Sequence, residues 1–346
     1  MKTFDLNTLV RTNVKSLKPY SSARDEFKDF NQKMIYLDAN ENPFENGVNR
    51  YPDPQQQDLK ALLAAKKNVK AENILIGNGS DEVLDLIFRA FCEPNQDNII
   101  TLPPTYGMYG VLADINAIEN KKIILKENFQ PDVEAILNEV TKETKLIFLC
   151  SPNNPTGNSF TDEAIKSLLE SFNGLVIIDE AYIDFSEKES WLQRLEEYPN
   201  LIVTQTLSKA YAMAGLRVGI LYASKAIISI LNKIKPPYNI NELSQQKAKE
   251  LLRLNKTNIQ IKELIFERNR IAKVLAEIPF VLDVYPSDAN FILFKVDDAV
   301  KRYNQLLNKG IVIRNRTNEP LCDNCLRITI GTFDENEKII SILKTL

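Results

Sequence analysis

The chain has 346 residues, of which 44% are hydrophobic and 26% charged, and its formal net charge is −3. These proportions are those of a globular protein, and the length predicts about two domains. The sequence has no basic stripe or basic arm, which argues against nucleic acid or an anionic membrane as the main partner. No apolar run is long enough to span a bilayer, and residues 1–7 lack the apolar core of a signal peptide, so we expect a cytoplasmic protein.

Histidine is absent from the whole sequence. Its absence removes Ser-His-Asp and Cys-His catalysis and every histidine-based metal site, and no metal is expected. Proton transfer near neutral pH therefore falls to Lys, Tyr, Asp, Glu or Cys. Cys92 and Cys150 lie in apolar runs and are expected to be reduced core residues. Cys322 and Cys325 form a single Cys-x-x-Cys, which by itself specifies neither a zinc site nor a redox site.

The first part of the chain predicts an arm followed by an α/β domain. About 30 N-terminal residues are polar and lack a clear period, so residues 1–40 are assigned to an N-terminal arm and part of a small domain. Residues 41–235 are assigned to a large domain, because strand and helix patterns alternate there, as is typical of a mainly parallel sheet covered by helices. Its clearest elements are helices over 56–67 and 82–91 and strands over 74–76, 146–150, 175–178 and 201–203.

The last part of the chain predicts a smaller α+β domain over residues 236–346. It begins at the break formed by Pro236 and Pro237. Helices are expected over 241–254, 257–277, 297–308 and 335–346, and strands over 290–296, 311–314 and 326–330.

A candidate anion site follows the strand over 74–76. Gly79, Ser80 and Asp81 come directly before the helix expected over 82–91. The unpaired N–H groups and the dipole at the start of a helix favour an anion such as a phosphate. The alternative is that Ser80 or Asp81 caps the helix, and a cap position is also where an anion binds.

Polar residues also follow the next apolar runs. Asn154 comes after the run over 146–150, and Asp179 and Tyr182 come after the run over 175–178. In an open α/β sheet, ligands bind at the carboxyl ends of the strands. We therefore expect these side chains to meet at one edge of the sheet.

A lysine follows the run over 201–203. Lys209 comes directly after Ser208 and three positions after Thr206, and Arg217 follows eight positions later. A lysine at the end of a buried strand, between anion-binding groups, suits a Schiff base to a phosphorylated aldehyde cofactor. Burial and a neighbouring cation are expected to lower the pKa of Lys209 towards neutral pH. Arg217 can hold a phosphate with two donors.

These motifs resemble those of the fold-type I pyridoxal-phosphate (PLP) aminotransferases, over nearly the whole chain. Asn-Pro-Thr-Gly at 154–157, Asp-x-x-Tyr at 179–182 and the Ser-Lys…Gly-x-Arg block at 208–217 mark that superfamily. Residues 19–24, 37–43 and 51–53 narrow the resemblance to the histidinol-phosphate aminotransferase family. The resemblance implies a large domain with a mainly parallel sheet flanked by helices and a smaller α+β domain.

The resemblance also implies roles around PLP. Lys209 is expected to hold the cofactor and to carry the substrate proton, and Asp179 to pair with the pyridine nitrogen. Tyr182 and Asn154 are expected to hydrogen-bond the ring 3-oxygen, and Tyr106 to stack on the ring. The phosphate-binding set implied by the family is Gly79, Ser80, Asp81, Thr206, Ser208 and Arg217.

For the substrate, the resemblance implies that Arg327 binds the glutamate carboxylate and that Arg314 faces a phosphate. Asn154 is also placed at the substrate, and Tyr20 closes over it from the N-terminal arm. Tyr51 is expected to reach the cofactor phosphate of the neighbouring subunit, which implies a homodimer with shared sites.

The implied reaction is the transamination of L-histidinol phosphate with 2-oxoglutarate, which gives imidazole acetol phosphate and glutamate in histidine biosynthesis. It runs as two half-reactions that share one site. An aromatic amino acid aminotransferase and a threonine-phosphate decarboxylase are the alternatives, because both would use the same cofactor residues. The preferred keto acid and the tolerance for aromatic amino acids stay open.

Overall fold

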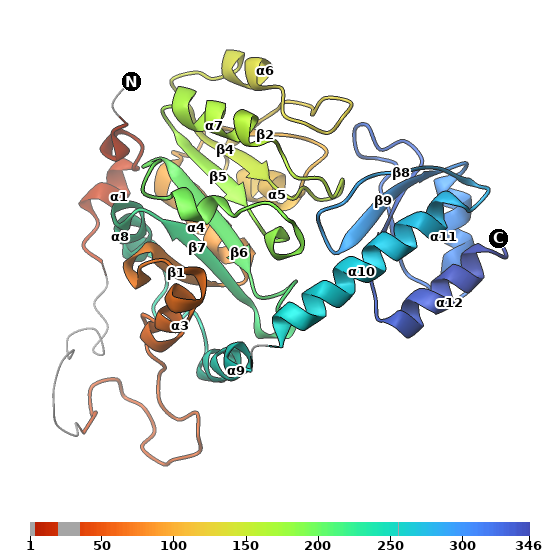
Figure 1. The fold of residues 1–346 in the computed structure, drawn as a ribbon. Coiled ribbons are helices and arrows are strands. Elements are labelled where there is room, and N and C mark those ends of the chain that lie inside the picture. The colour runs from red at the N-terminus through yellow and green to blue at the C-terminus, as the bar shows by residue number, and fades with distance from the viewer. Residues whose placement is uncertain (1–3, 20–34, 255) are drawn as a thin grey trace.

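The computed structural model describes residues 4–19, 35–254 and 256–346, and its larger part is built on a seven-stranded sheet (Figure 1). The strand order is β1-β7-β6-β5-β4-β2-β3. β7 runs antiparallel to β1 and β6, and the pairs from β6 to β3 are parallel. The predicted α/β fold with a mainly parallel sheet is therefore confirmed. The strands are β1 (Ile74–Asn78), β2 (Asn98–Thr101), β3 (Glu119–Lys122), β4 (Thr144–Cys150), β5 (Leu175–Asp179), β6 (Leu201–Thr206) and β7 (Val218–Ala223).

Helices cover both faces of this sheet. Successive side chains of a strand point to opposite faces, so β4 contributes Leu146 and Phe148 to one apolar cluster and Ile147 and Leu149 to the other. A strand buried on both faces is apolar throughout, and this is why β4, β5 and β6 could be predicted from the sequence. One face is covered by α4 (Ser80–Phe91), α5 (Met108–Ile115) and α8 (Lys225–Ile234), the other by α3 (Gln57–Lys67), α6 (Val133–Asn138) and α7 (Asp162–Ser171).

The first described residues pack against the larger part of the chain, whereas the sequence predicts an irregular arm. A short 3-10 helix, η1 (Leu6–Thr8), leads into α1 (Thr12–Ser16), which packs against α8. Leu9, Val10 and Val14 are buried in the same cluster as α4 and α8. Arg11 adds an ion pair of 3.2 Å to Glu93. Three apolar side chains in a stretch this short are too few to show a helical period.

The smaller part of the chain has a four-stranded antiparallel sheet in the order β10-β11-β9-β8. Pairing of β10 begins only at Arg314, opposite Arg327, so this strand is shorter than the predicted one and ends later. The strands are β8 (Val281–Val284), β9 (Phe291–Val296), β10 (Arg314–Asn315) and β11 (Cys325–Thr329). The helices that follow the larger sheet are α9 (Glu242–Arg253), α10 (Thr257–Ala276), α11 (Ala299–Asn308) and α12 (Phe333–Leu343).

Helix α10 connects the two parts, as the long cyan helix in Figure 1 shows. Within α10, the Arg268 guanidinium donates to the carbonyl of Phe185 at 3.2 Å and to that of Ala289 at 2.9 Å. These two bonds tie α10 both to the segment after β5 and to the loop before β9. Helix α9 packs on α3 of the larger part. The domain boundaries at 40/41 and 235/236 stay predictions.

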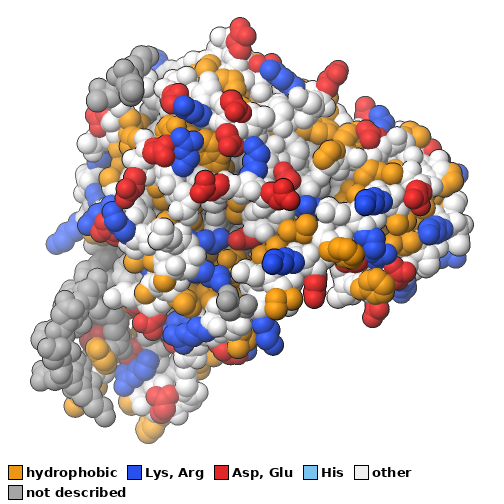
Figure 2. Space-filling view, viewed as in Figure 1, with side chains coloured by type: hydrophobic (Ala, Val, Ile, Leu, Met, Phe, Trp, Pro, Cys, Tyr) orange, Lys and Arg blue, Asp and Glu red, His pale blue; other side chains and the backbone are white. Residues whose placement is uncertain are grey.

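The surface carries charges of both signs. Figure 2 shows acidic and basic side chains interspersed on the face in view, which fits the net charge of −3. Within the described ranges, no helix combines the length and the apolar character needed to cross a bilayer.

Candidate active site

A cavity of about 160 Å³ lies at the carboxyl ends of β4, β5 and β6. Of the residues that the sequence predicts around PLP, all except Gly79 and Tyr51 line it. Parallel strands that end at the same edge bring these distant segments together. The lining residues are Ser80, Asp81, Tyr106, Cys150, Asn154, Asp179, Ala181, Tyr182, Thr206, Ser208, Lys209, Ala214 and Arg217.

The start of α4 forms one end of the cavity. Gly79 is the N-cap residue and has a φ of +81°, a backbone conformation that other residues rarely adopt. A β-carbon at this position would also collide with the Arg217 guanidinium, so the glycine lets that cation approach the backbone. Because Gly79 has no side chain, it cannot cap the first-turn N–H groups of α4. Arg217 lies 3.8 Å from the Asp81 carboxylate.

Lys209 lies in the bend after β6 and borders two hollows. Its pKa is lowered, first by burial and then by the positive charges of Arg327 and Arg217, while the negative charge of Asp179 acts in the opposite direction. The side chain keeps solvent-exposed surface because it also borders a second, wider cleft. A lowered pKa leaves more of the amine neutral, which a nucleophile and proton carrier requires.

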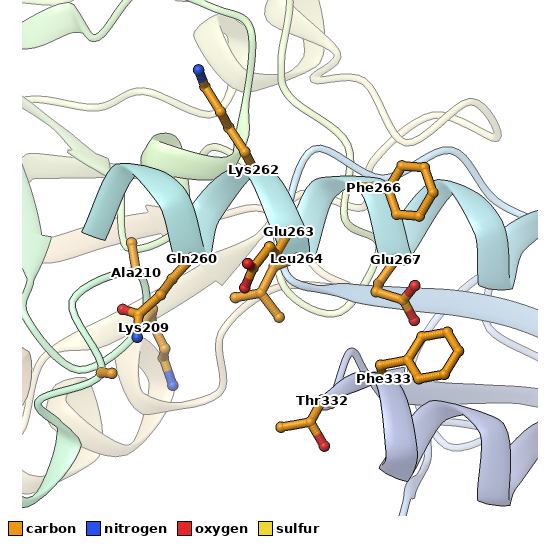
Figure 3. Close-up of a pocket in the computed structure, with 12 residues that line it drawn as sticks. Lys209, Ala210, Gln260, Lys262, Glu263, Leu264, Phe266, Glu267, Thr332 and Phe333 are labelled. Carbon is orange, nitrogen blue, oxygen red and sulfur yellow. The ribbon is translucent and has the colours of Figure 1, made fainter. Parts of the chain in front are cut away.

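The wider cleft has a volume of about 690 Å³ and runs from Lys209 along α10 to the start of α12 (Figure 3). Glu263 and Leu264 of α10 line one side of it, and Thr332 and Phe333 line the other. Lys209 is the residue that both hollows share. The cleft therefore gives small molecules a route to the lysine from solvent.

Asp179 ends β5 and is 3% exposed. Its Oδ2 accepts a hydrogen bond of 2.7 Å from the Tyr109 hydroxyl, and its Oδ1 accepts one of 3.2 Å from the Ala181 N–H. Burial raises the pKa of Asp179, and these two donors lower it. Both donors are neutral. A buried carboxylate with neutral partners is costly unless a cation joins it, so the cavity suits a positively charged ligand atom beside Asp179.

Tyr109 is a site residue that the sequence analysis does not identify. It is 1% exposed, stacks on Phe148 at 4.9 Å and meets the ring of Tyr106 edge-on at 5.6 Å. In the sequence it is one more apolar-type residue of a core helix. Tyr106 lies before the start of α5, so the spacing of three residues gives no helical signal that would pair Tyr109 with it.

Tyr106 and Tyr182 line the cavity near the lysine and the carboxylate. The Tyr106 hydroxyl donates to Asp81 at 3.1 Å, and the centre of the Tyr182 ring lies 5.7 Å from Lys209 Nζ. Burial raises the pKa of both phenols, which keeps them protonated. The stacking role of Tyr106 and the hydrogen bonds of Tyr182 and Asn154 to a cofactor stay predictions.

The small sheet reaches this cavity through Arg327. Its guanidinium donates a hydrogen bond to the side-chain oxygen of Asn154. Arg314 lies opposite Arg327 in the sheet and is exposed. Arg316, to which the sequence analysis gives no role, is partly buried, and its charge lowers the pKa of Arg327 after the larger effect of burial. Arg316 also acts to lower the pKa of Tyr182.

Two predicted residues are not brought to the cavity. Tyr51 lies in a separate hollow, stacks on Tyr238 with ring centres 4.5 Å apart, and is 51% exposed. Tyr20 lies outside the described residues.

Glu180 is a buried carboxyl group directly behind the cavity. Its Oε1 accepts from the Trp191 N–H at 2.7 Å, and its Oε2 accepts from the Ser190 hydroxyl and from the Gln205 amide. Burial raises the pKa of Glu180 to about 7, against the effect of these hydrogen bonds. Glu180 thus holds the segment after β5, which also contains Ala181 and Tyr182, to the end of β6.

Comparisons with known proteins show the family of the chain. A family model described as aminotransferase class I and II matches residues 25–343. A histidinol-phosphate aminotransferase of Flavobacterium johnsoniae is 69% identical over 100% of both chains. Among solved structures, the histidinol-phosphate aminotransferase from Clostridium acetobutylicum has a TM-score of 0.79 and 27% identity, over 86% of this chain and 90% of that one. The enzyme of that name from Sinorhizobium meliloti, in complex with pyridoxal-5'-phosphate, shares the fold with a TM-score of 0.78 and 23% identity, over 86% and 82%.

The matched residues cover most of the chain, and the high identity extends over its full length. The chain belongs to the class I and II aminotransferases, and within them to the histidinol-phosphate aminotransferases. The resemblance seen in the sequence is confirmed. Proteins of this family are PLP-dependent, so the cofactor follows at the level of the family.

Tyr109→Phe tests the role of the Tyr109 hydroxyl, because it keeps the stacked ring. The Tyr109 hydroxyl lowers the pKa of Asp179, so its loss should raise that pKa further. The acid limb of the pH profile of kcat/KM should then move to higher pH. Tyr222→Phe is the matched control, because Tyr222 is fully buried and its hydroxyl has no partner within the described residues. Identical pH profiles for both variants would refute the role.

Glu180→Gln tests the pH dependence of stability. The pKa of Glu180 is about 7 in the folded chain and 4.5 in the unfolded chain, so folding favours the protonated form. Its contribution to stability is fully present below pH 4.5 and is lost as pH rises through 7, at a cost of up to about 3 kcal/mol. Urea unfolding at pH 5.5 and pH 8 should show a smaller decrease in stability for Glu180→Gln than for the wild type. An unchanged decrease would contradict the raised pKa.

Proposed function

We propose that this protein transfers the amino group of L-histidinol phosphate to 2-oxoglutarate, giving imidazole acetol phosphate and glutamate, with PLP bound at Lys209. The family membership supports this reaction, and one observation carries the cofactor assignment. In the same cavity, a buried carboxylate with neutral donors, Asp179, accompanies a lysine of lowered pKa and the uncapped start of α4. The identity of 69% to a relative of that name favours this substrate over an aromatic amino acid or threonine phosphate.

The residues present fit PLP at both of its ends. Asp179 would provide the negative charge that keeps a ring nitrogen protonated, and its own buried charge would gain a partner. When bound, PLP supplies an electron sink that stabilises negative charge on the substrate carbon. At the other end, Arg217 and the N–H groups at the start of α4 would hold the phosphate. Thr206 and Ser208 line the cavity beside them, and the Ser208 N–H donates to the Thr206 hydroxyl at 3.1 Å.

Lys209 would have two tasks in succession. It would hold the cofactor covalently until the substrate amine displaces it, and its free amine would then accept the proton from the substrate Cα. The lowered pKa favours the neutral amine that this transfer needs. The lysine is already in place when it is displaced, so the proton transfer needs no further encounter.

The substrate anions would bind on the side of the small sheet. Arg327 would bind the carboxylate of glutamate or 2-oxoglutarate, and Arg314 would face the substrate phosphate. The contact between Arg327 and Asn154 supports this placement, because it puts the guanidinium beside the cavity. Asn154 and Tyr20 would complete the substrate contacts.

We infer further that the functional unit is a homodimer in which Tyr51 reaches the cofactor phosphate of the neighbouring subunit. Tyr51 is away from the cavity of its own chain and is half exposed. Ile35, Leu37 and Phe44, in the segment of sequence that precedes Tyr51, are more than four-fifths exposed. Large apolar side chains exposed in one segment are typical of an interface, and a second copy would cover them.

The first test is the absorbance spectrum of the purified protein with PLP, before and after L-histidinol phosphate is added without a keto acid. The band of the lysine-bound cofactor should disappear, that of pyridoxamine phosphate should appear, and one equivalent of imidazole acetol phosphate should be released. Lys209→Ala should lose the first band and all turnover but keep its circular dichroism spectrum. If the band changes with aromatic amino acids and not with histidinol phosphate, the substrate is an aromatic amino acid instead. Absence of the band of the lysine-bound cofactor in the wild type with added PLP would refute PLP as the cofactor.

Mixing two inactive or weakened chains tests the shared site. Lys209→Ala and Tyr51→Phe chains are unfolded together, refolded together and supplied with limiting PLP. If Tyr51 serves the neighbouring site, each mixed dimer has one intact site, and about a quarter of wild-type activity should return in a random mixture. If Tyr51 serves its own chain, every site of the mixed dimer keeps one defect and activity does not rise above that of the separate chains.

A further inference from the structure

The small sheet has two chemically different faces. Side chains alternate along its strands, so residues two apart share a face. One face packs into the apolar cluster of α10, α11 and α12, through Ile292, Phe294, Leu326 and Ile328. The other face packs into the cluster of the larger part, through Phe291, Leu293 and Cys325. The second face is therefore the one turned towards the cavity.

Three arginines lie on this second face. Arg327 is two residues after Cys325, and Arg314 lies directly opposite Arg327 in the sheet. The Arg316 N–H donates to the carbonyl of Cys325 at 2.8 Å, which continues the same register by two residues. Arg314, Arg316 and Arg327 thus form one group on neighbouring strands, and Arg316 is diagonal to Arg327, where long side chains can meet.

The positive charges of this group are poorly compensated. The Nε atoms of Arg316 and Arg327 are both buried without a hydrogen-bond partner within the described residues. Arg316 is 3.7 Å from the Glu319 carboxylate, which is too long for a hydrogen bond. Burial lowers the pKa of Arg327, and the charges of Arg316 and Arg314 lower it further. Since guanidinium stays protonated in proteins, this cost is relieved by an anion and not by loss of a proton.

We propose that Arg316 is a specificity-determining residue that completes a three-arginine site for the phosphate of the substrate. This inference rests on the proposed function. Histidinol phosphate has no carboxylate and glutamate has no phosphate, so an anion site that serves both half-reactions has to accept each of them in turn. A carboxylate has one charge and two oxygens, which a single bidentate arginine satisfies. A phosphate monoester has a charge of about −1.5 to −2 and three terminal oxygens, so it can accept hydrogen bonds from a further arginine.

The experiment measures each half-reaction separately in holoenzyme carrying Arg316→Gln. One hydrogen-bonded charge contributes roughly tenfold to hundredfold in affinity. We expect KM for histidinol phosphate to rise by about that factor with little change in kcat, and KM for glutamate to change less than about threefold. Arg316→Lys keeps the charge but lacks the planar guanidinium, so its KM for histidinol phosphate should lie between those of the wild type and Arg316→Gln. Lys301→Gln, on the exposed side of α11, removes one charge elsewhere on the same part of the chain and is the control.

The outcomes separate this inference from the proposed function. An equal loss for both substrates, or no loss for either, would overturn the role of Arg316. A wild-type holoenzyme that does not react with histidinol phosphate would overturn the proposed function instead. In that case inorganic phosphate is the probe, added to the holoenzyme in a calorimeter and as an inhibitor of the glutamate half-reaction. Phosphate binding that weakens tenfold or more in Arg316→Gln supports the anion site, and equal binding by both proteins overturns it.

Discussion

The site depends on a carboxyl group buried at the last residue of β5. Asp179 is buried, and Tyr109 and Ala181 supply one neutral donor to each of its oxygens. These donors make the ionised form tolerable but leave its charge unbalanced, so the cavity is prepared for a cation before any ligand arrives. The parallel neighbours β4 and β6 end at the same edge, which fixes Asn154 and Lys209 relative to that charge.

The residues that follow buried strands could be predicted from the sequence, and the reason is geometric. Asn154, Asp179 and Lys209 each come soon after an apolar run, and parallel strands place such positions at one edge of a sheet. The long helix α10 was also predictable, because 20 residues give its apolar period many repeats. Family motifs then distinguished a cofactor site from a set of strand-end turns.

Residues that act through a distant partner could not be predicted in the same way. The hydroxyl of Tyr109 meets Asp179 across 70 positions of sequence, and nothing near Tyr109 indicates that partner. Arg316 acquires its neighbours from the pairing of two short strands, and one of them pairs over only two residues. Glu180 follows Asp179 in the Asp-x-x-Tyr motif, but its pKa is raised by burial, against the hydrogen bonds from Ser190, Trp191 and Gln205, and only the fold provides these.

The division of the site between two sheets has a consequence for the size of the substrate. Lys209 follows a strand of the larger sheet, and the arginines belong to the smaller one, joined to it by α10 and the Arg268 hydrogen bonds. A molecule that places its amine at the lysine and its anion at the arginines has to match the distance between two packed bodies. With the substrate anion at the arginines, as proposed, the fixed spacing of the two sheets would select for length, and a phosphorylated amine that is one or two bonds shorter would reach one end and miss the other.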